Sequence, residues 1–165
     1  MILAIDPGSK AGFAVVGAGG VVWCTQVDTS RVPWDVACAR YQRAIDEARA
    51  VAPGNVEIVM EAPCYAANRR RKEGTTPGLA ERVGMIRALV WTTFERAPQN
   101  VLWRDWQAIA HRGRVLGTPE ERSLGYVRDV LRVPEAWIVG PKGGVLWDAV
   151  TACAIGGAAQ EMSCS

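Results

Sequence analysis

The chain has 165 residues, of which 49% are hydrophobic, and 19 Lys and Arg residues against 17 Asp and Glu residues give it a net charge of +2. The length suits one domain with a sizeable core, and so small a net charge gives no general preference for polyanions, so any nucleic-acid surface must come from local clusters of cations. The five cysteines are odd in number and lack a C-x-x-C spacing, which argues against a disulfide framework or a zinc site and predicts a reducing cytoplasm.

The first predicted element is a short strand that ends at an acid. Residues 2–5 are an apolar run long enough for a buried strand. Pro7 and Gly8 then end it, because proline lacks a backbone donor and glycine permits positive φ. Asp6 is therefore predicted at the carboxyl end of this strand, isolated from other acids.

Two further strands are predicted directly after this turn. Residues 12–17 and 21–27, separated by Gly19 and Gly20, are apolar runs that return across the sheet, so the first three strands form an antiparallel meander. An acid, a turn and a hairpin in this order open two fold families. In the ribonuclease-H-like nucleases the acid holds a metal, and in the actin-like ATPases the turn binds phosphate.

The next segments alternate between helix and strand. Apolar residues at three- and four-residue spacing over 34–51 predict an amphipathic helix that ends before Pro53. Residues 56–60 predict a fourth strand, which stops at Glu61 and so places a second acid at a strand end. After a polar loop, residues 79–93 show the apolar stripe of a second helix.

The last third of the chain is predicted to be mainly helical. Residues 101–103 predict a short fifth strand, and a helix follows Thr118, whose side chain forms a capping box with Glu121. Residues 145–159 predict a final helix that is apolar on nearly every side and carries one acid, Asp148. The whole order predicts an α/β fold, a five-stranded mixed sheet flanked by helices, in a single domain over 1–165.

Three lone acids in apolar surroundings form the candidate catalytic site: Asp6, Glu61 and Asp148. Burying three such charges separately would be costly, whereas convergence around divalent cations removes that cost. Mg²⁺ prefers hard oxygen ligands of this kind, and Mn²⁺ is expected to substitute for it. In a two-metal site about 3.5–4 Å across, one ion generates hydroxide and the other stabilises the leaving oxygen of a phosphodiester.

On these residues the chain resembles the RuvC family of Holliday-junction resolvases, within the ribonuclease-H-like superfamily. The resemblance implies a Mg²⁺-dependent endonuclease that acts as a homodimer on branched DNA, and the small size and divergent last motif resemble bacteriophage-type members. The similar segments are 2–9 with the first acid, 59–61 with the second, 79–90 in the following helix, 117–122 with the substrate-contacting cation at Arg122, and 148–155 in the terminal acidic helix.

The terminal motif departs from the family pattern, which places two metal ligands three residues apart on one helix face. If Asp148 is the first member, the second position holds Thr151; if it is the second member, the first position holds Val145. Thr151 is a weak candidate metal ligand, because a hydroxyl can bind a metal-bound water but supplies no negative charge. The two registers stay open at this point.

Two polar clusters are candidates for DNA binding. The run of four cations after Glu61 can follow phosphates, and the resemblance implies that an aromatic residue there, Tyr65, stacks on a base at the branch point. Trp103 and Trp106 are expected to line the site, and most other tryptophans are expected in the core. The candidate DNA-binding residues are Tyr65, Asn68, Arg69, Arg70, Arg71, Lys72, His111, Arg112, Arg114 and Arg122.

Three alternative functions remain open. They are a ribonuclease-H-type nuclease on RNA–DNA hybrids, a catalytically weak branched-DNA-binding protein, and an actin-like ATPase fragment using residues 8–10, which the length disfavours. No apolar run approaches the roughly 20 residues of a membrane span, so we expect a soluble, unprocessed protein of the bacterial or phage-infected host cytoplasm, without membrane partners. The sequence does not indicate a helicase partner.

Overall fold

The computed structural model describes residues 1–62 and 76–163, and within them a five-stranded mixed sheet runs in the order β3-β2-β1-β4-β5. β1, β2 and β3 form the predicted antiparallel meander, while β4 pairs parallel with both β1 and β5. The mixed sheet predicted from the sequence is confirmed. The strands are β1 Ile2–Asp6, β2 Lys10–Gly17, β3 Gly20–Asp28, β4 Glu57–Glu61 and β5 Gln99–Val101.

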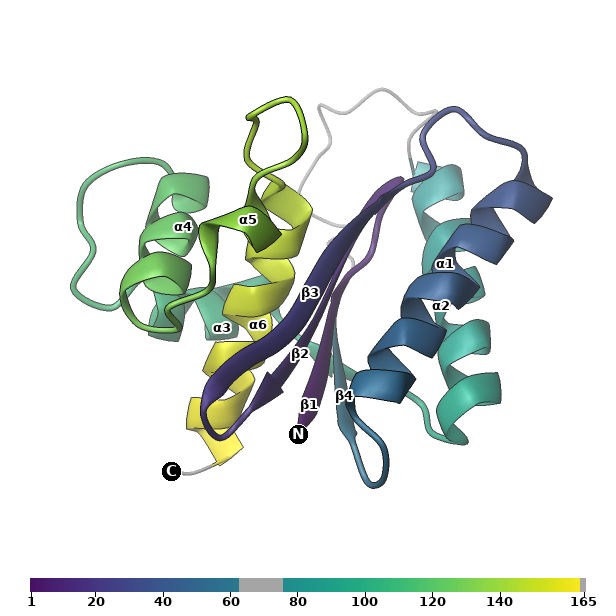
Figure 1. The fold of residues 1–165 in the computed structure, drawn as a ribbon, viewed down its shortest axis with the longest axis horizontal. Coiled ribbons are helices and arrows are strands. Elements are labelled where there is room, and N and C mark those ends of the chain that lie inside the picture. Colours follow the sequence, from purple (N-terminus) through teal and green to yellow (C-terminus); the bar gives the residue numbers. More distant parts are fainter. Residues whose placement is uncertain (63–75, 164–165) are drawn as a thin grey trace.

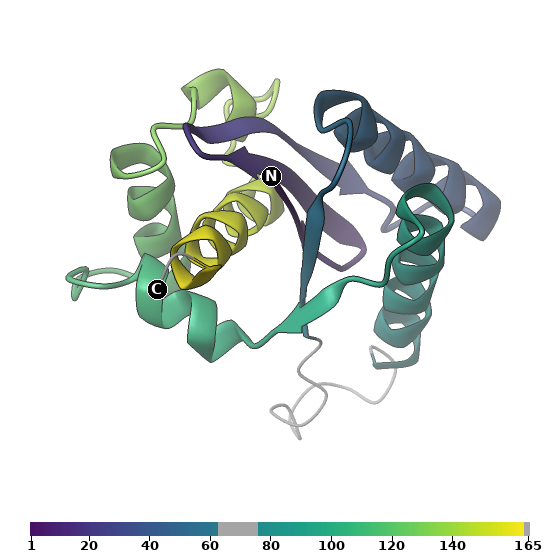
Figure 2. The same ribbon diagram turned by 90° about the horizontal axis from the view of Figure 1, so that it is seen from below.

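Helices cover both faces of this sheet (Figure 1). On one face α6 packs directly on β1 and β2, with α3 and α4 packed against α6; α1 and α2 cover the other face (Figure 2). Among the described residues, no helix is long and apolar enough to cross a membrane. The helices are α1 Trp34–Val51, α2 Thr76–Phe94, α3 Trp103–Ala110, α4 Pro119–Asp129, α5 Glu135–Ile138 and α6 Trp147–Ser163.

The central strand β1 is buried on both faces, which explains its unbroken apolar sequence. Ile2 and Ala4 belong to the core under α6, whereas Leu3 and Ile5 belong to the core under α1 and α2. Successive side chains of a strand point to opposite faces, so one four-residue run serves both cores. The strand that ends in Asp6 is therefore fixed from two sides.

Small residues allow α6 to lie close to the sheet. A Cβ atom added at Gly156 would lie 2.5 Å from Cγ2 of Val16 and 3.1 Å from Cβ of Ala4. The first contact is shorter than real Cβ atoms allow and the second is tight, so a larger residue would push the helix away from the strands. The small-residue composition of α6 is therefore a condition for its position.

The region around β5 differs from the prediction. The fifth strand covers Gln99–Val101 rather than 101–103, and the helix α3, which the sequence did not predict, begins at Trp103. Val101 is buried, whereas Leu102 and Trp103 are 42% and 48% exposed. Three adjacent apolar residues suggested a buried strand, but only the first of them enters the core.

The expectation that most tryptophans lie in the core is wrong. Trp106 is buried at 3% exposure and Trp23 is partly buried. Helical spacing alone could not reveal that several of these rings face solvent rather than the core. The exposed tryptophans are Trp34, Trp91, Trp103, Trp137 and Trp147.

Candidate active site

The parallel pairing of β1 and β4 brings the first two acids to one edge of the sheet. Ile5 is the register partner of Met60, and the next residue of each strand is Asp6 and Glu61. The carboxyl ends of parallel strands lie at the same edge of a sheet. Asp6 and Glu61, the last residues of β1 and β4, therefore both lie at this edge. Both residues are partly buried.

The third acid, Asp148, lies near Asp6 because a glycine on β2 leaves room for the start of α6. Gly12 on β2 is the register partner of Asp6, and a Cβ atom built on Gly12 would lie only 1.7 Å from the carbonyl oxygen of Asp148. No other residue type fits there without displacing the start of α6. The first turn of α6 therefore rests on the backbone of β2, next to the end of β1.

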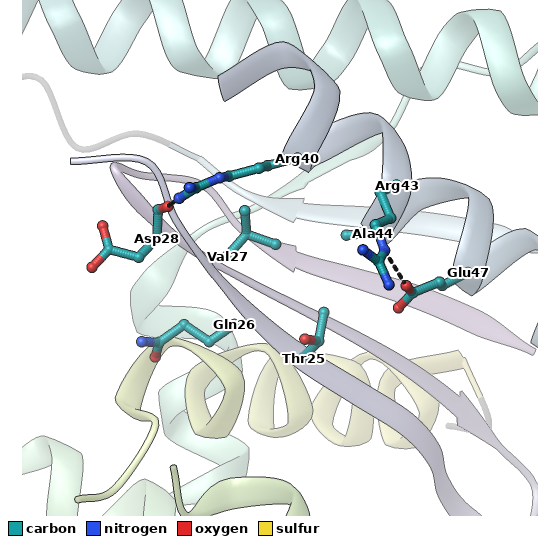
Figure 3. Close-up of a pocket in the computed structure, with 8 residues that line it drawn as sticks. All are labelled: Thr25, Gln26, Val27, Asp28, Arg40, Arg43, Ala44 and Glu47. Carbon is teal, nitrogen blue, oxygen red and sulfur yellow. Dashed lines mark hydrogen bonds and ion pairs between the residues drawn. The ribbon is translucent and has the colours of Figure 1, made fainter. Parts of the chain in front are cut away.

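A side chain from β3 also holds this helix start. Gln26 is the register partner of Gly12, and the backbone N–H of Asp148 donates a hydrogen bond of 3.1 Å to its Oε1. Figure 3 shows Gln26 pointing from β3 toward α6, on the opposite side of the strand from Arg40 and Arg43. The bond satisfies one of the free amide groups at the helix N-terminus. Sequence reasoning missed Gln26, since its role depends on sheet register.

Burial and mutual repulsion perturb the three acids. Burial raises the pKa of Asp6 well above its usual value, and the charges of Glu61 and Asp148 raise it further. Burial raises the pKa of Glu61 to about 7, while the nearby indole N–H of Trp106 acts in the opposite direction. Burial also raises the pKa of Asp148, against the effects of its backbone N–H and Lys10. The acids therefore act on one another electrostatically.

The chemistry of these donors fits a divalent cation. Three carboxyl groups supply hard oxygen ligands, and a cation between them would relieve the repulsion that raises the pKa of Asp6. Within residues 1–62 and 76–163, however, no three His, Cys, Asp or Glu side chains are gathered closely enough to hold a metal ion together. Among the described residues, the carboxyl groups therefore influence the pKa of Asp6 without forming a closed set of ligands.

Two buried hydroxyl groups, from Tyr41 and Thr29, hold the turn after Asp6. The Tyr41 hydroxyl donates to the carbonyl oxygen of Gly8 at 2.7 Å, and Oγ1 of Thr29 donates to the carbonyl oxygen of Ser9 at 2.9 Å. Both side chains are fully buried. These bonds hold the turn in place. Asp6 is therefore positioned by β1 on its N-terminal side and by the bonded turn on its C-terminal side.

A cavity of about 500 Å³ opens beside this turn and is lined by Asp6, Asp148 and residues 7–9. Two cations, Lys10 and Arg82, also line it, although the sequence predicted neither as a residue of the catalytic site. Lys10 follows the turn directly in the chain, so the sequence could have predicted that it lies near Asp6. Arg82 reaches the cavity from α2, which only tertiary packing reveals.

The structure distinguishes the two possible partners of Asp148 by their place relative to α6. Thr151 lies one turn after Asp148 in the helix and is partly buried. Val145 precedes the helix and forms an isolated β-bridge with Val139. Thr151 is therefore the residue that shares a helix face with Asp148.

The first DNA-binding cluster lies outside the described residues. It comprises the aromatic and polar positions and the cation run that follow Glu61 in the sequence. The residues concerned are Tyr65, Asn68, Arg69, Arg70, Arg71 and Lys72.

The second cluster is partly brought together. His111 lies edge-on to Trp106 and its Nε2 is 2.9 Å from Oγ of Ser123. Burial lowers the pKa of His111, and the charges of Arg122 and Arg114 lower it further, so the three residues lie near one another. Trp106 thus contacts His111 and also influences Glu61.

The arginines of this cluster differ in their surroundings. Arg114 pairs with Asp129 at 3.5 Å and lies over the ring of Tyr126, 5.8 Å from its centroid. Arg112 is exposed. The Nε atom of Arg122 is buried without a hydrogen-bond partner among the described residues. These contacts keep part of the cluster in place on α4 and the loop before it.

Fold and acid placement together define an α/β protein with the ribonuclease-H-like arrangement of strands and helices. Among solved structures, the chain is similar to T. thermophilus RuvC in complex with Holliday junction substrate, with 22% identity and a TM-score of 0.62 over 98% of this chain and 95% of that one. It is also similar to a second Thermus thermophilus RuvC structure, with 20% identity and a TM-score of 0.61 over 98% and 96%. No protein-family model and no curated protein matches the sequence. The chain therefore has the fold of RuvC.

Proposed function

We propose that this protein is a metal-dependent, structure-selective endodeoxyribonuclease that cuts Holliday junctions or other branched DNA. The observation that carries the proposal is the placement of three acids, from the ends of β1 and β4 and the start of α6, near enough at one edge of a RuvC-like sheet that Glu61 and Asp148 raise the pKa of Asp6. The similar T. thermophilus structure contains a Holliday junction substrate, which supports this class of DNA.

Asp6, Glu61 and Asp148 would hold Mg²⁺, or Mn²⁺ in its place, with two ions expected per site. When bound, the ions would activate water and stabilise the leaving oxygen of the phosphodiester. The protein supplies the rigid turn that orients Asp6, the helix start that presents Asp148, and a hydroxyl at Thr151 that can orient water. Lys10 lies where it offsets part of the negative charge of Asp148.

Two features extend the proposal to the whole DNA substrate. A four-way junction has two strands to be nicked symmetrically, so we propose that the protein works as a homodimer. The candidate DNA-binding residues, from Tyr65 to Lys72 and from His111 to Arg122, would contact the arms. We place this activity in the bacterial or phage-infected host cytoplasm, where such DNA occurs.

The test is cleavage of a labelled synthetic four-way junction with Mg²⁺ or Mn²⁺, alongside a linear duplex and an RNA–DNA hybrid. We expect junction cleavage by the wild type and a loss of about 100-fold or more in Asp6→Asn. The matched control is Asp46→Asn, at an exposed position of α1 that is bonded to Gln42. Equal junction cleavage by Asp6→Asn and wild type refutes the proposal, and preference for the hybrid redirects it to a ribonuclease-H-type activity.

A second candidate is a catalytically weak protein that binds branched DNA. It is favoured by Thr151 at the position of an acidic ligand and by the spread of the acids in the described part of the chain. Tight junction binding without cleavage in either Mg²⁺ or Mn²⁺ would support this candidate over the nuclease.

A further inference from the structure

We propose that Arg82 binds a backbone phosphate of the DNA substrate in the cavity beside Asp6 and Asp148, and that Trp34 and Thr29 hold its guanidinium group in position. The inference rests on the proposed function, since it adds a phosphate-binding residue to the same site. It follows from the cavity lining, from two contacts of the guanidinium group and from the charges around it.

Arg82 lines the same cavity as two of the acids. The lining includes Asp6 and Asp148 together with Arg82 and Leu79, both from α2. A phosphodiester at this edge of the sheet would meet carboxyl groups and a guanidinium group together. Arginine suits such a position because its planar fork of N–H donors matches two phosphate oxygens at once.

Two contacts fix the guanidinium group. Its central carbon lies 4.7 Å from the centroid of the Trp34 ring, and one of its terminal nitrogens donates a hydrogen bond of 3.3 Å to Oγ1 of Thr29. Stacking on a ring uses none of the five N–H donors, and among the described residues one hydrogen bond uses one of them. The remaining donors are available to a ligand in the cavity.

The same contacts connect Arg82 to the catalytic turn. Thr29, which accepts the bond from Arg82, also donates to the carbonyl oxygen of Ser9, three residues after the end of β1 at Asp6. A phosphate held by Arg82 would therefore have a fixed position relative to Asp6. Fixed placement of a reacting group relative to catalytic groups is a major source of rate enhancement.

The positive charge of Arg82 has no carboxylate partner within the described residues. The ion pairs found there involve Arg43, Arg104, Arg114 and Arg128. Trp34 is 44% exposed, so its ring does not serve as a core residue that merely covers the arginine. An anionic ligand accounts both for a cation without a carboxylate partner in the described part of the chain and for the exposed ring beside it.

The test measures the affinity for a fluorescent four-way junction in EDTA between 50 and 200 mM salt, together with cleavage in Mg²⁺. Each lost phosphate contact lowers the slope of log K against log salt by about 0.9. We expect Arg82→Gln to show that loss and a fall in kcat of at least about tenfold. Arg82→Lys should restore the slope through its charge but not kcat, because it lacks the fork.

Two further variants separate binding from structure. Arg87→Gln, on the same helix and bonded to Asn100, is the matched control and should retain the slope and kcat. Trp34→Ala should retain the slope and lower kcat, with partial rescue in Trp34→Phe, because the ring only positions the arginine. Circular dichroism melts identify variants that fail to fold, and Arg82→Lys then decides the outcome alone.

The outcomes separate this inference from the proposed function. A wild type that cleaves junctions, with a folded Arg82→Gln of unchanged slope and kcat, overturns only the role of Arg82. A lowered melting temperature with an unchanged slope assigns Arg82 a structural role and also overturns it. A wild type that neither binds nor cleaves branched DNA overturns both.

Discussion

Asp6 is placed where its charge is unfavourable unless a cation compensates it. Burial and the charges of Glu61 and Asp148 raise its pKa well above the usual value. The turn that follows is held by Tyr41 and Thr29, so Asp6 has little freedom to move away into water. Arrangements of this kind, which cost stability and are kept by the surrounding structure, are characteristic of functional sites.

The first prediction concerns the stability of Asp6→Asn. The acids have raised pKa values in the folded state, so the folded protein binds more protons than the unfolded chain, and stability falls as the pH rises. For Glu61 the loss runs from its ordinary value of 4.5 to about 7. In EDTA at pH 8, we expect Asp6→Asn to melt above wild type, by about 2–4 °C for each kcal/mol gained.

Calorimetry at pH 5 and pH 8 provides the measurement. The stabilising effect of Asp6→Asn should be smaller at pH 5, and added Mg²⁺ should stabilise the wild type more than the variant at pH 8. A variant that melts below the wild type at pH 8 would show that the charge of Asp6 does not destabilise the fold.

The second prediction concerns the residue one turn after Asp148. Thr151→Asp adds a carboxylate on the same helix face, so the Mg²⁺ concentration for half-maximal activity should fall roughly tenfold. Val145→Asp is the matched comparison, because Val145 precedes α6 and should not improve the Mg²⁺ dependence. Improvement in Val145→Asp alone would reverse the assignment of the register.

At the scale of elements, the site depends on how closely α6 approaches the sheet. Asp6, Gly12 and Gln26 form a row across β1, β2 and β3, and the start of α6 lies on this row. Neither Gly12 nor Gln26 carries chemistry itself. They determine where the helix begins and therefore where Asp148 lies relative to Asp6.

The third prediction tests the glycine in this row. Gly12→Ala places a Cβ atom against the Asp148 carbonyl, so the helix start must move, at a cost of about 1–3 kcal/mol. Denaturant unfolding should show this loss, and junction cleavage should fall further than stability explains. Gly19→Ala is the control, because nothing lies within 4 Å of a Cβ atom there. Equal behaviour of the two variants would contradict the close contact.

The fourth prediction tests the bond from β3. Gln26→Met keeps the side-chain length but removes the acceptor for the Asp148 N–H, which should cost about 1 kcal/mol and lower kcat with little change in junction affinity. Thr25→Val, on the other face of β3, should leave kcat unchanged. If Gln26→Met matches wild type in both stability and kcat, the bond does not position Asp148.

At the scale of the whole molecule, the sheet collects residues that are far apart in the sequence. Local signals were enough to predict Asp6 and Glu61 at strand ends, because each is followed by residues that stop a strand. Their pairing follows from the parallel register of β1 and β4, which the sequence alone does not state. The resemblance to a known family supplied that step, and the similar solved structures confirm the fold.

The residues that the sequence did not reveal share one property. Gly12, Gln26 and Arg82 act through contacts between elements, and no local pattern marks them. The wrong prediction of a strand over 101–103 has the same origin. Packing between elements decides which of these three apolar residues is buried, and only Val101 is. Local patterns predicted most elements, whereas contacts between elements determine the site.

The most direct test of the central claim is a crystal structure of the protein grown with Mn²⁺, with the metal located by its anomalous scattering. We predict one or two peaks between the carboxyl groups of Asp6, Glu61 and Asp148, and their loss in Asp6→Asn. A fully occupied Mn²⁺ site elsewhere, with no peak among these three acids at saturating metal, would contradict the account.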